Sequence, residues 1–189
     1  RLSTALHLGT ERPSFLKNTK TFYTLIKALI FLTLVTSATI SVFSFVFGQL
    51  FWGLTFIDFP GILLVILATM SMGLFLSIIT INIAFLSFKK GSDPDVVLYP
   101  ILSTISDIFL TACYIFVLIL YFHGGFGQVI LSLIAIIVVF FGIYMLIKNF
   151  HETVFAKTIR ESLFTIVVVA FLVNIAGTVL IGIRGFGGT

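Results

Sequence analysis

One acidic residue of this sequence, Asp107, lies inside a long apolar segment. The other six acidic residues fall in polar loops or at expected helix ends: Glu11, Asp58, Asp93, Asp95, Glu152 and Glu161. A carboxylate at the centre of a membrane helix costs about 2.5–3.5 kcal/mol on insertion scales. Intramembrane ionisable residues mark pathways or sites more often than they serve only for packing. Asp107 is therefore the first candidate for a functional group.

Hydroxyl side chains recur around Asp107 at helical spacing. Positions three and four apart share a helix face, and the resulting polar stripe consists of Ser103, Thr104, Asp107, Thr111 and Tyr114. Mg²⁺ gives up its waters reluctantly and is commonly held through one or two carboxylates. The stripe predicts a metal site in which Asp107 supplies charge while Ser103, Thr104 and Thr111 contact the ion's waters. Alternatively, Asp107 is a neutral acid bonded to a neighbouring helix, and the hydroxyls mediate helix packing.

Other kinds of chemistry have little support in the sequence. Cys113 is the single cysteine, which excludes an intrachain disulfide and thiolate zinc clusters. The three histidines, His7, His123 and His151, lie outside the apolar segments and are too scattered to predict a metal site. Intramembrane aspartyl proteolysis requires two aspartates, whereas a single one lies within an apolar segment here. We do not expect the protein to be an enzyme.

The composition shows which solvent surrounds these residues. Of 189 residues, 59% are hydrophobic and 10% are charged, and the mean hydropathy is +1.24. A soluble domain carries about 25% charged residues. Five stretches reach the roughly 20 apolar residues that a membrane helix needs: Phe22–Phe47, Gly61–Phe88, Val97–Phe122, Gln128–Lys148 and Ser162–Ile183. We predict an all-α, polytopic transmembrane helix bundle of about five membrane-spanning helices within a lipid bilayer.

The basic residues predict the orientation of this bundle. If the five helices alternate in direction, ten basic residues fall on one side: Arg1, Arg12, Lys17, Lys20, Lys27, Lys89, Lys90, Lys148, Lys157 and Arg160. Only Arg184 falls on the other. The positive-inside rule makes the basic side cytoplasmic, so we expect an integral plasma-membrane protein. The net charge of +4 then reflects topology and contact with anionic lipid rather than nucleic-acid binding.

Two segments carry a family resemblance. Residues 93–116, DPDVVLYPILSTISDIFLTACYIF, resemble the membrane domain of the MgtE magnesium channels and their eukaryotic solute-carrier relatives. That family has an Asp-Pro followed by a Pro and a Thr-x-x-Asp, positions held here by Asp93, Pro94, Pro100, Thr104 and Asp107. Residues 1–13, RLSTALHLGTERP, resemble the segment after the family's second helix, particularly in archaeal members.

The resemblance implies a role for Asp107 and a partner for this chain. In the family the matching aspartate faces a central ion pathway and binds hydrated Mg²⁺ together with its symmetry mate. Ser103, one turn before Asp107, would lie beside the same ion. The transported Mg²⁺ could also be bound in the pore. The partner would be a second MgtE-like unit, either in the same chain or in a homodimer.

The resemblance also predicts the domain organisation. Residues 1–122 would be an MgtE-like transmembrane unit that lacks its first helices. Residues 123–153 would be a connector transmembrane helix and its loop, which two odd-numbered units need if they are to lie in parallel. Residues 154–189 would be the first helix of a second MgtE-like unit.

Divalent cation transport, most notably of Mg²⁺, is the function that these features favour. Two alternatives stay open at the level of sequence: a membrane scaffold subunit that does not transport, and a proton-coupled carrier of another solute that uses Asp107 as a relay. The identity of the ion, the choice between channel and exchanger, gating and oligomeric state are not determined by these residues.

Overall fold

The structure is a computed structural model that describes residues 6, 8–9, 12–15, 18–91 and 94–186, with the side chains of all of these except 94–103 and 183–186. Within these residues the secondary structure consists of long α-helices, without a strand. Five helices are long and apolar enough to cross a membrane. The expected all-α bundle of about five spans is therefore confirmed.

The helices follow one another with short links. They are α2 (Lys20–Trp52), α3 (Phe59–Lys89), α4 (Pro94–Phe122), α5 (Gly125–Asn149) and α6 (Thr153–Phe186). Each contains one of the five expected apolar stretches. The start of α6 differs most, because the helix begins nine residues before Ser162. Its first turns are polar, and Lys157 Nζ lies 3.9 Å from Glu161 Oε1, a spacing of four residues that supports a helix in water.

Local sequence signals account for several helix ends. The Thr19 hydroxyl accepts a hydrogen bond of 3.2 Å from the Phe22 N–H and so caps the start of α2. Gly91 follows α3 with a φ of +74°, a conformation that glycine adopts without strain. Pro94 opens α4, where its missing N–H does no harm. A helix that starts at Pro94 predicts Asp93 as its N-cap, and Asp93 lies outside the described residues.

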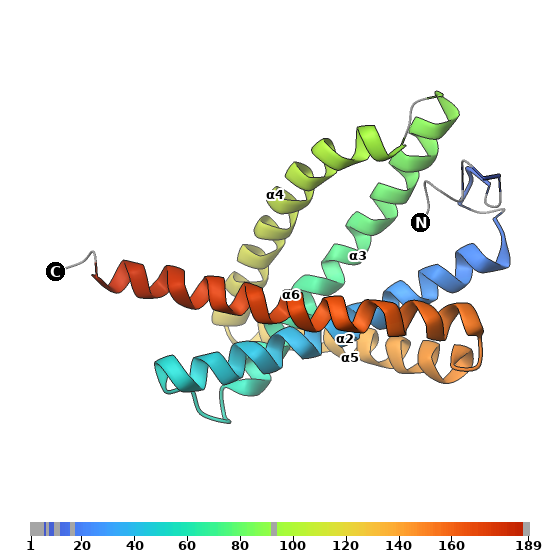
Figure 1. Ribbon diagram of the computed structural model, residues 1–189. Helices are drawn as coiled ribbons and strands as arrows, with labels where there is room; N and C mark the ends of the chain where they lie inside the picture. Colours follow the sequence, from blue (N-terminus) through green and yellow to red (C-terminus); the bar gives the residue numbers. More distant parts are fainter. Residues whose placement is uncertain (1–5, 7, 10–11, 16–17, 92–93, 187–189) are drawn as a thin grey trace.

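Helix α2 is the centre of the bundle. It packs most extensively against α6, with which it runs parallel, and it also contacts α3 and α5. Gly142 of α5 allows a close approach to α2, because a Cβ at this position would lie 2.9 Å from Leu34 Cδ2. Helices α3 and α4 form an antiparallel hairpin that leans away from the layer formed by α2, α5 and α6 (Figure 1).

Two clusters of buried side chains join these elements. The first, Val65, Ala68, Val117 and Leu131, lies where α3, α4 and α5 meet. The second, Leu6, Phe22 and Phe85, ties the N-terminal segment to α2 and α3. The helices alternate in direction, so the start of α2 and the α3–α4 and α5–α6 links share one end of the bundle (Figure 1). This basic end carries Lys20, Lys89 and Lys148, as the charge pattern predicts.

Candidate functional site

Asp107 lies at the middle of α4, 13 positions after Pro94 and 15 before Phe122. At 1.5 Å per residue, this places it about 20 Å from the start of the helix. Its side chain is exposed. Among the residues that the structure describes, none forms a hydrogen bond or an ion pair with its carboxylate. Helix α4 therefore presents an uncovered carboxylate close to its midpoint.

The neighbouring hydroxyl groups lie on the same side of α4. Thr104 and Thr111, one turn before and one turn after Asp107, are both exposed. Tyr114, one turn beyond Thr111, is 45% exposed. Ser103 also belongs to α4, but its side chain lies outside the described part of the structure. Polar side chains thus follow one side of the helix over about 15 Å.

The side of α4 next to the polar stripe packs against the bundle. Val117 is fully buried in the cluster that joins α3, α4 and α5. Leu110 lies against Gly73 of α3, where an added Cβ would come within 3.3 Å of Leu110 Cδ2. Because Leu110 and Val117 hold α4 in place, the polar side that contains Asp107 is oriented by the bundle but not enclosed by it.

The chemistry available at Asp107 is that of a single carboxylate with hydroxyl neighbours. The described residues contain no group of three or more His, Cys, Asp or Glu side chains able to hold a metal ion together. A cation here would therefore keep most of its own waters. Mg²⁺ behaves in this way in proteins, whereas structural Zn²⁺ sites use four protein ligands.

Comparison with known proteins identifies the family. A family model described as MgtE, divalent cation transporter, matches residues 1–117, more than half of the chain. The chain belongs to the MgtE family. Neither the curated proteins nor the solved structures gave a significant match. The family match indicates divalent cation transport as the general function. The matched residues include Thr104, Asp107 and Thr111.

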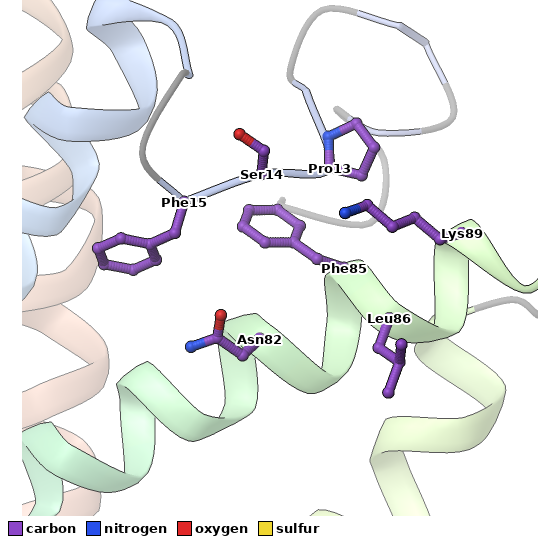
Figure 2. Close-up of a pocket in the computed structure, with 7 residues that line it drawn as sticks. All are labelled: Pro13, Ser14, Phe15, Asn82, Phe85, Leu86 and Lys89. Carbon is purple, nitrogen blue, oxygen red and sulfur yellow. The ribbon is translucent and has the colours of Figure 1, made fainter.

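A crevice at the basic end of this MgtE-family chain provides a contrast to Asp107. Its volume is about 320 Å³, and it lies between residues 13–15 and the last turns of α3. Figure 2 shows Phe85 extending between the two walls, with Asn82 on one side of it and Lys89 on the other. The Lys89 ammonium would repel a divalent cation, and none of the described residues that line the crevice carries a carboxylate. This crevice is therefore not a candidate for the cation site.

Sequence reasoning did not anticipate a group of polar contacts at the same end of the bundle, which we call the basic-end clasp. Lys27 Nζ donates to Asn149 Oδ1 at 2.9 Å, and Thr24 Oγ1 donates to Glu152 Oε2 at 2.8 Å. Lys20 Nζ lies 3.4 Å from Glu152 Oε1. The Thr24 hydrogen bond, assisted by Lys20, lowers the pKa of Glu152. The clasp ties α2 to the α5–α6 link, a pairing of distant segments that helical spacing does not reveal.

Serine residues within α2 serve helix packing. Ser37 and Ser41 are fully buried, and each hydroxyl donates to a carbonyl four residues earlier in α2. Ser44 Oγ donates to Asn174 Oδ1 of α6 at 2.8 Å. The spacing of these serines predicts a helix contact face, and their burial agrees with it. The partnership between Ser44 and Asn174 is visible only in the structure.

Proposed function

We propose that this chain carries Mg²⁺ across the plasma membrane along the side of α4 that bears Asp107. The observation that supports this most is an exposed carboxylate at the middle of a membrane-spanning helix. Lipid tails could cover it only at a cost of about 2.5–3.5 kcal/mol. A hydrated divalent cation would instead compensate its charge. The family to which the chain belongs supports the same choice, since its members transport divalent cations.

Each polar residue of the stripe has a proposed part in ion binding. Asp107 supplies the negative charge, and Ser103, Thr104 and Thr111 contact waters around the ion. Mg²⁺ usually retains several waters and is held through one or two carboxylates. Because Coulomb attraction grows with ionic charge, a monovalent cation would gain less from the same carboxylate. Selectivity would thus come from accepting a small dication with its waters.

A second MgtE-like unit would cover the exposed side of α4 and complete the pathway, either in the same chain or in a homodimer. We assign residues 1–122 to one unit, 123–153 to a connector that contains α5, and 154–189 to the first helix of a second unit. The family match stops at residue 117, near the end of α4, which supports a unit boundary there. The parallel packing of α6 along α2 leaves the Asp107 side of α4 open for such a unit.

We also propose that the basic end of the bundle faces the cytoplasm. Lys20, Lys89, Lys90 and Lys148 lie at the start of α2, the end of α3 and the end of α5. Short loops rich in Lys and Arg are retained on the cytoplasmic side of membranes. Mg²⁺ would then enter the pathway from the end that carries Asp58.

Ion flux into proteoliposomes tests the proposal. The full-length protein would be reconstituted as wild type, Asp107→Asn and Glu161→Gln, with an imposed Mg²⁺ gradient. Loss of one full charge beside the ion should reduce flux by at least about tenfold, which corresponds to 1.4 kcal/mol. Glu161→Gln removes an exposed carboxylate near the start of α6 and should retain flux. Undiminished Mg²⁺ flux in Asp107→Asn would refute the proposed pathway.

The same assay separates the competing functions. Flux driven by a pH gradient without any divalent ion would identify a proton-coupled carrier. Absence of flux in well-folded wild type and variant alike would favour a scaffold subunit. Competition between Mg²⁺ and Mn²⁺, Co²⁺ or Zn²⁺ would determine the preferred ion. We expect these other ions to inhibit Mg²⁺ flux only when they are present in large excess.

A further inference from the structure

A cleft of about 830 Å³ lies between α2, α3, α4 and α6. It is located at the end of the bundle opposite the basic end, where α2 finishes and α3 begins. Its walls are mostly aliphatic and aromatic, and they include Phe47, Leu54, Ile62, Ile66, Leu118 and Val173. The cleft separates the α3–α4 hairpin from the α2–α6 pair.

Three polar side chains in the wall, on α2 and α6, direct hydrogen atoms to protein acceptors. Ser44 Oγ donates to Asn174 Oδ1 at 2.8 Å, and Asn174 Nδ2 donates to the Ala170 carbonyl at 2.8 Å. Thr178 Oγ1 donates to the Asn174 carbonyl, also at 2.8 Å. These three side chains therefore offer few hydrogen atoms to a molecule inside the cleft, whereas Trp52, Tyr114 and Tyr121 also line it with polar groups of their own. About 28 waters at 30 Å³ each would fill it, and most of them would face hydrocarbon.

The mouth of the cleft carries a negative charge. Asp58 Oδ2 accepts hydrogen bonds from the Thr55 N–H at 2.8 Å and the Thr55 hydroxyl at 2.9 Å. These bonds lower the pKa of Asp58, so the carboxylate is ionised at neutral pH. No Lys or Arg in the described part of the chain forms an ion pair with it. Trp52, 46% exposed, lines the same region, as interfacial aromatic residues do.

We propose that this cleft binds a glycerophospholipid whose headgroup carries an amine, with its acyl chains between α4 and α6 and its ammonium group near Asp58. The apolar walls match acyl chains, and the cleft is open, so the chains can extend beyond it along the bundle. The Asp58 carboxylate attracts an ammonium group and repels a headgroup that is only anionic. Trp52 adds an aromatic surface of the kind that binds quaternary or primary ammonium groups.

The alternative occupant is water, with the cleft acting as a branch of the ion pathway. Tyr114 lines the cleft and lies on the same side of α4 as Asp107, so the two regions adjoin. The mostly apolar walls favour lipid over water. The proposal does not depend on Mg²⁺ transport, and its tests do not measure flux.

Native mass spectrometry can detect the lipid directly. The full-length protein would be extracted from vesicles that contain equal amounts of phosphatidylethanolamine and phosphatidylglycerol. Gly177→Phe should fill the cleft, because Gly177 lines it and a Cβ there meets no atom within 4 Å. Gly182→Phe is the matched control, since this α6 glycine is equally open but does not belong to the cleft.

The wild type and Gly182→Phe should each retain phospholipid, and Gly177→Phe should lose it while keeping its thermal unfolding midpoint. Equal retention in Gly177→Phe would overturn the proposed position, and no retained lipid in the wild type would overturn the site itself.

The headgroup is tested by Asp58→Asn. We expect phosphatidylethanolamine to be enriched about two- to fivefold in the wild type, as suits an exposed ion pair, and not in the variant. No enrichment in the wild type would refute the role of Asp58.

Thiol labelling separates lipid from water. In a Cys113→Ala background, which removes the single cysteine, Gly177→Cys would be treated in proteoliposomes with a water-soluble, membrane-impermeant maleimide. His123→Cys, at the exposed α4–α5 link, reports the rate in water. Gly177→Cys should react more than about tenfold more slowly, because apolar surroundings suppress the thiolate. Equal rates would show a water-filled cleft and refute the lipid proposal.

Discussion

The polar residues of the α2–α5–α6 layer and those of α4 differ in their surroundings. In the layer, polar side chains pair across helices or with the α5–α6 link: Thr24 with Glu152, Lys27 with Asn149, and Ser44 with Asn174. On α4, Asp107 and Thr111 are exposed, and the structure shows no side chain bonded to the Asp107 carboxylate within the residues it describes. The two sets look alike in the sequence, where each is a polar residue in or beside an apolar run.

This difference separates polar residues that hold helices together from those available to a ligand. Inside a membrane, a polar side chain that finds a partner on another helix contributes about 0.6 kcal/mol, with a maximum near 1.7 kcal/mol. A carboxylate that faces lipid has a cost instead. Substitution should therefore affect a different property in each region. In the layer it should lower the stability of the protein, and on α4 it should reduce transport.

The largest expected contrast in stability involves Asp107→Leu. If the carboxylate serves transport, its replacement by an apolar side chain should leave the thermal unfolding midpoint in lipid bicelles unchanged or raise it. The gain in free energy would be at most the cost of the carboxylate in lipid, about 2.5–3.5 kcal/mol. Circular dichroism during heating would measure the midpoint. A lower midpoint, or loss of assembly on size-exclusion chromatography, would instead mean that Asp107 joins helices.

Asn149→Leu should have a nearly equal effect in the opposite direction. Asn149 is 2% exposed and accepts from Lys27 Nζ, which is half-buried. Removing the acceptor leaves a charged donor unpaired, at a cost of about 1.5–3 kcal/mol in the free energy of unfolding. The double variant with Lys27→Met should recover much of this loss, because both partners are then apolar. Additive losses in that cycle would show that the two residues act independently.

Thr111→Val should reduce Mg²⁺ flux without a change in stability. The substitution removes one hydroxyl beside Asp107, and a single hydrogen bond of about 0.5–1.5 kcal/mol corresponds to a two- to tenfold change in flux. Thr69→Val of α3 is the control, because the Thr69 hydroxyl is bonded to the Val65 carbonyl within its own helix. An equal reduction in both variants would remove the distinction between the α4 stripe and ordinary helical threonines.

Ser44→Ala tests a single pair in the layer. The variant leaves Asn174 Oδ1 without its donor and should lower the free energy of unfolding by about 0.6 kcal/mol. Denaturation in increasing sodium dodecyl sulfate would measure the change. Ser132→Ala is matched to it, since the Ser132 hydroxyl bonds only to the Gln128 carbonyl of its own helix among the described contacts. The prediction fails if the two variants lose equal stability.

The smallest expected effect is a pH dependence of the basic-end clasp. The Thr24 hydrogen bond and Lys20 lower the pKa of Glu152 from its ordinary 4.5. A carboxylate with a lowered folded-state pKa stabilises the protein above its unfolded pKa, and this stabilisation is lost as the pH falls through the folded value. The thermal midpoints of wild type and Glu152→Gln should therefore differ at pH 7 and converge below pH 4.5. A difference that persists at acid pH would contradict this account.

The sequence by itself determined the fold class, the spans and the family. Apolar runs of sufficient length require membrane helices because lipid provides no partners for backbone groups, and the bounds of α2 to α5 follow from this. Helix ends such as Gly91 and Pro94 depend only on neighbouring residues of the chain, so they too are determined locally. The Asp-Pro, Pro and Thr-x-x-Asp pattern indicated the MgtE family, which the match over residues 1–117 shows.

Only the tertiary structure decided which polar residues have partners. The contacts of Lys27 with Asn149 and of Ser44 with Asn174 join residues more than 120 positions apart. Helical spacing relates residues within one helix, so it cannot reveal which helices become neighbours. The uncovered position of Asp107 and the cleft between α4 and α6 likewise depend on how α3 and α4 lean away from the other helices. Residue types set the available chemistry, and packing determines which of those residues face an open side of the bundle.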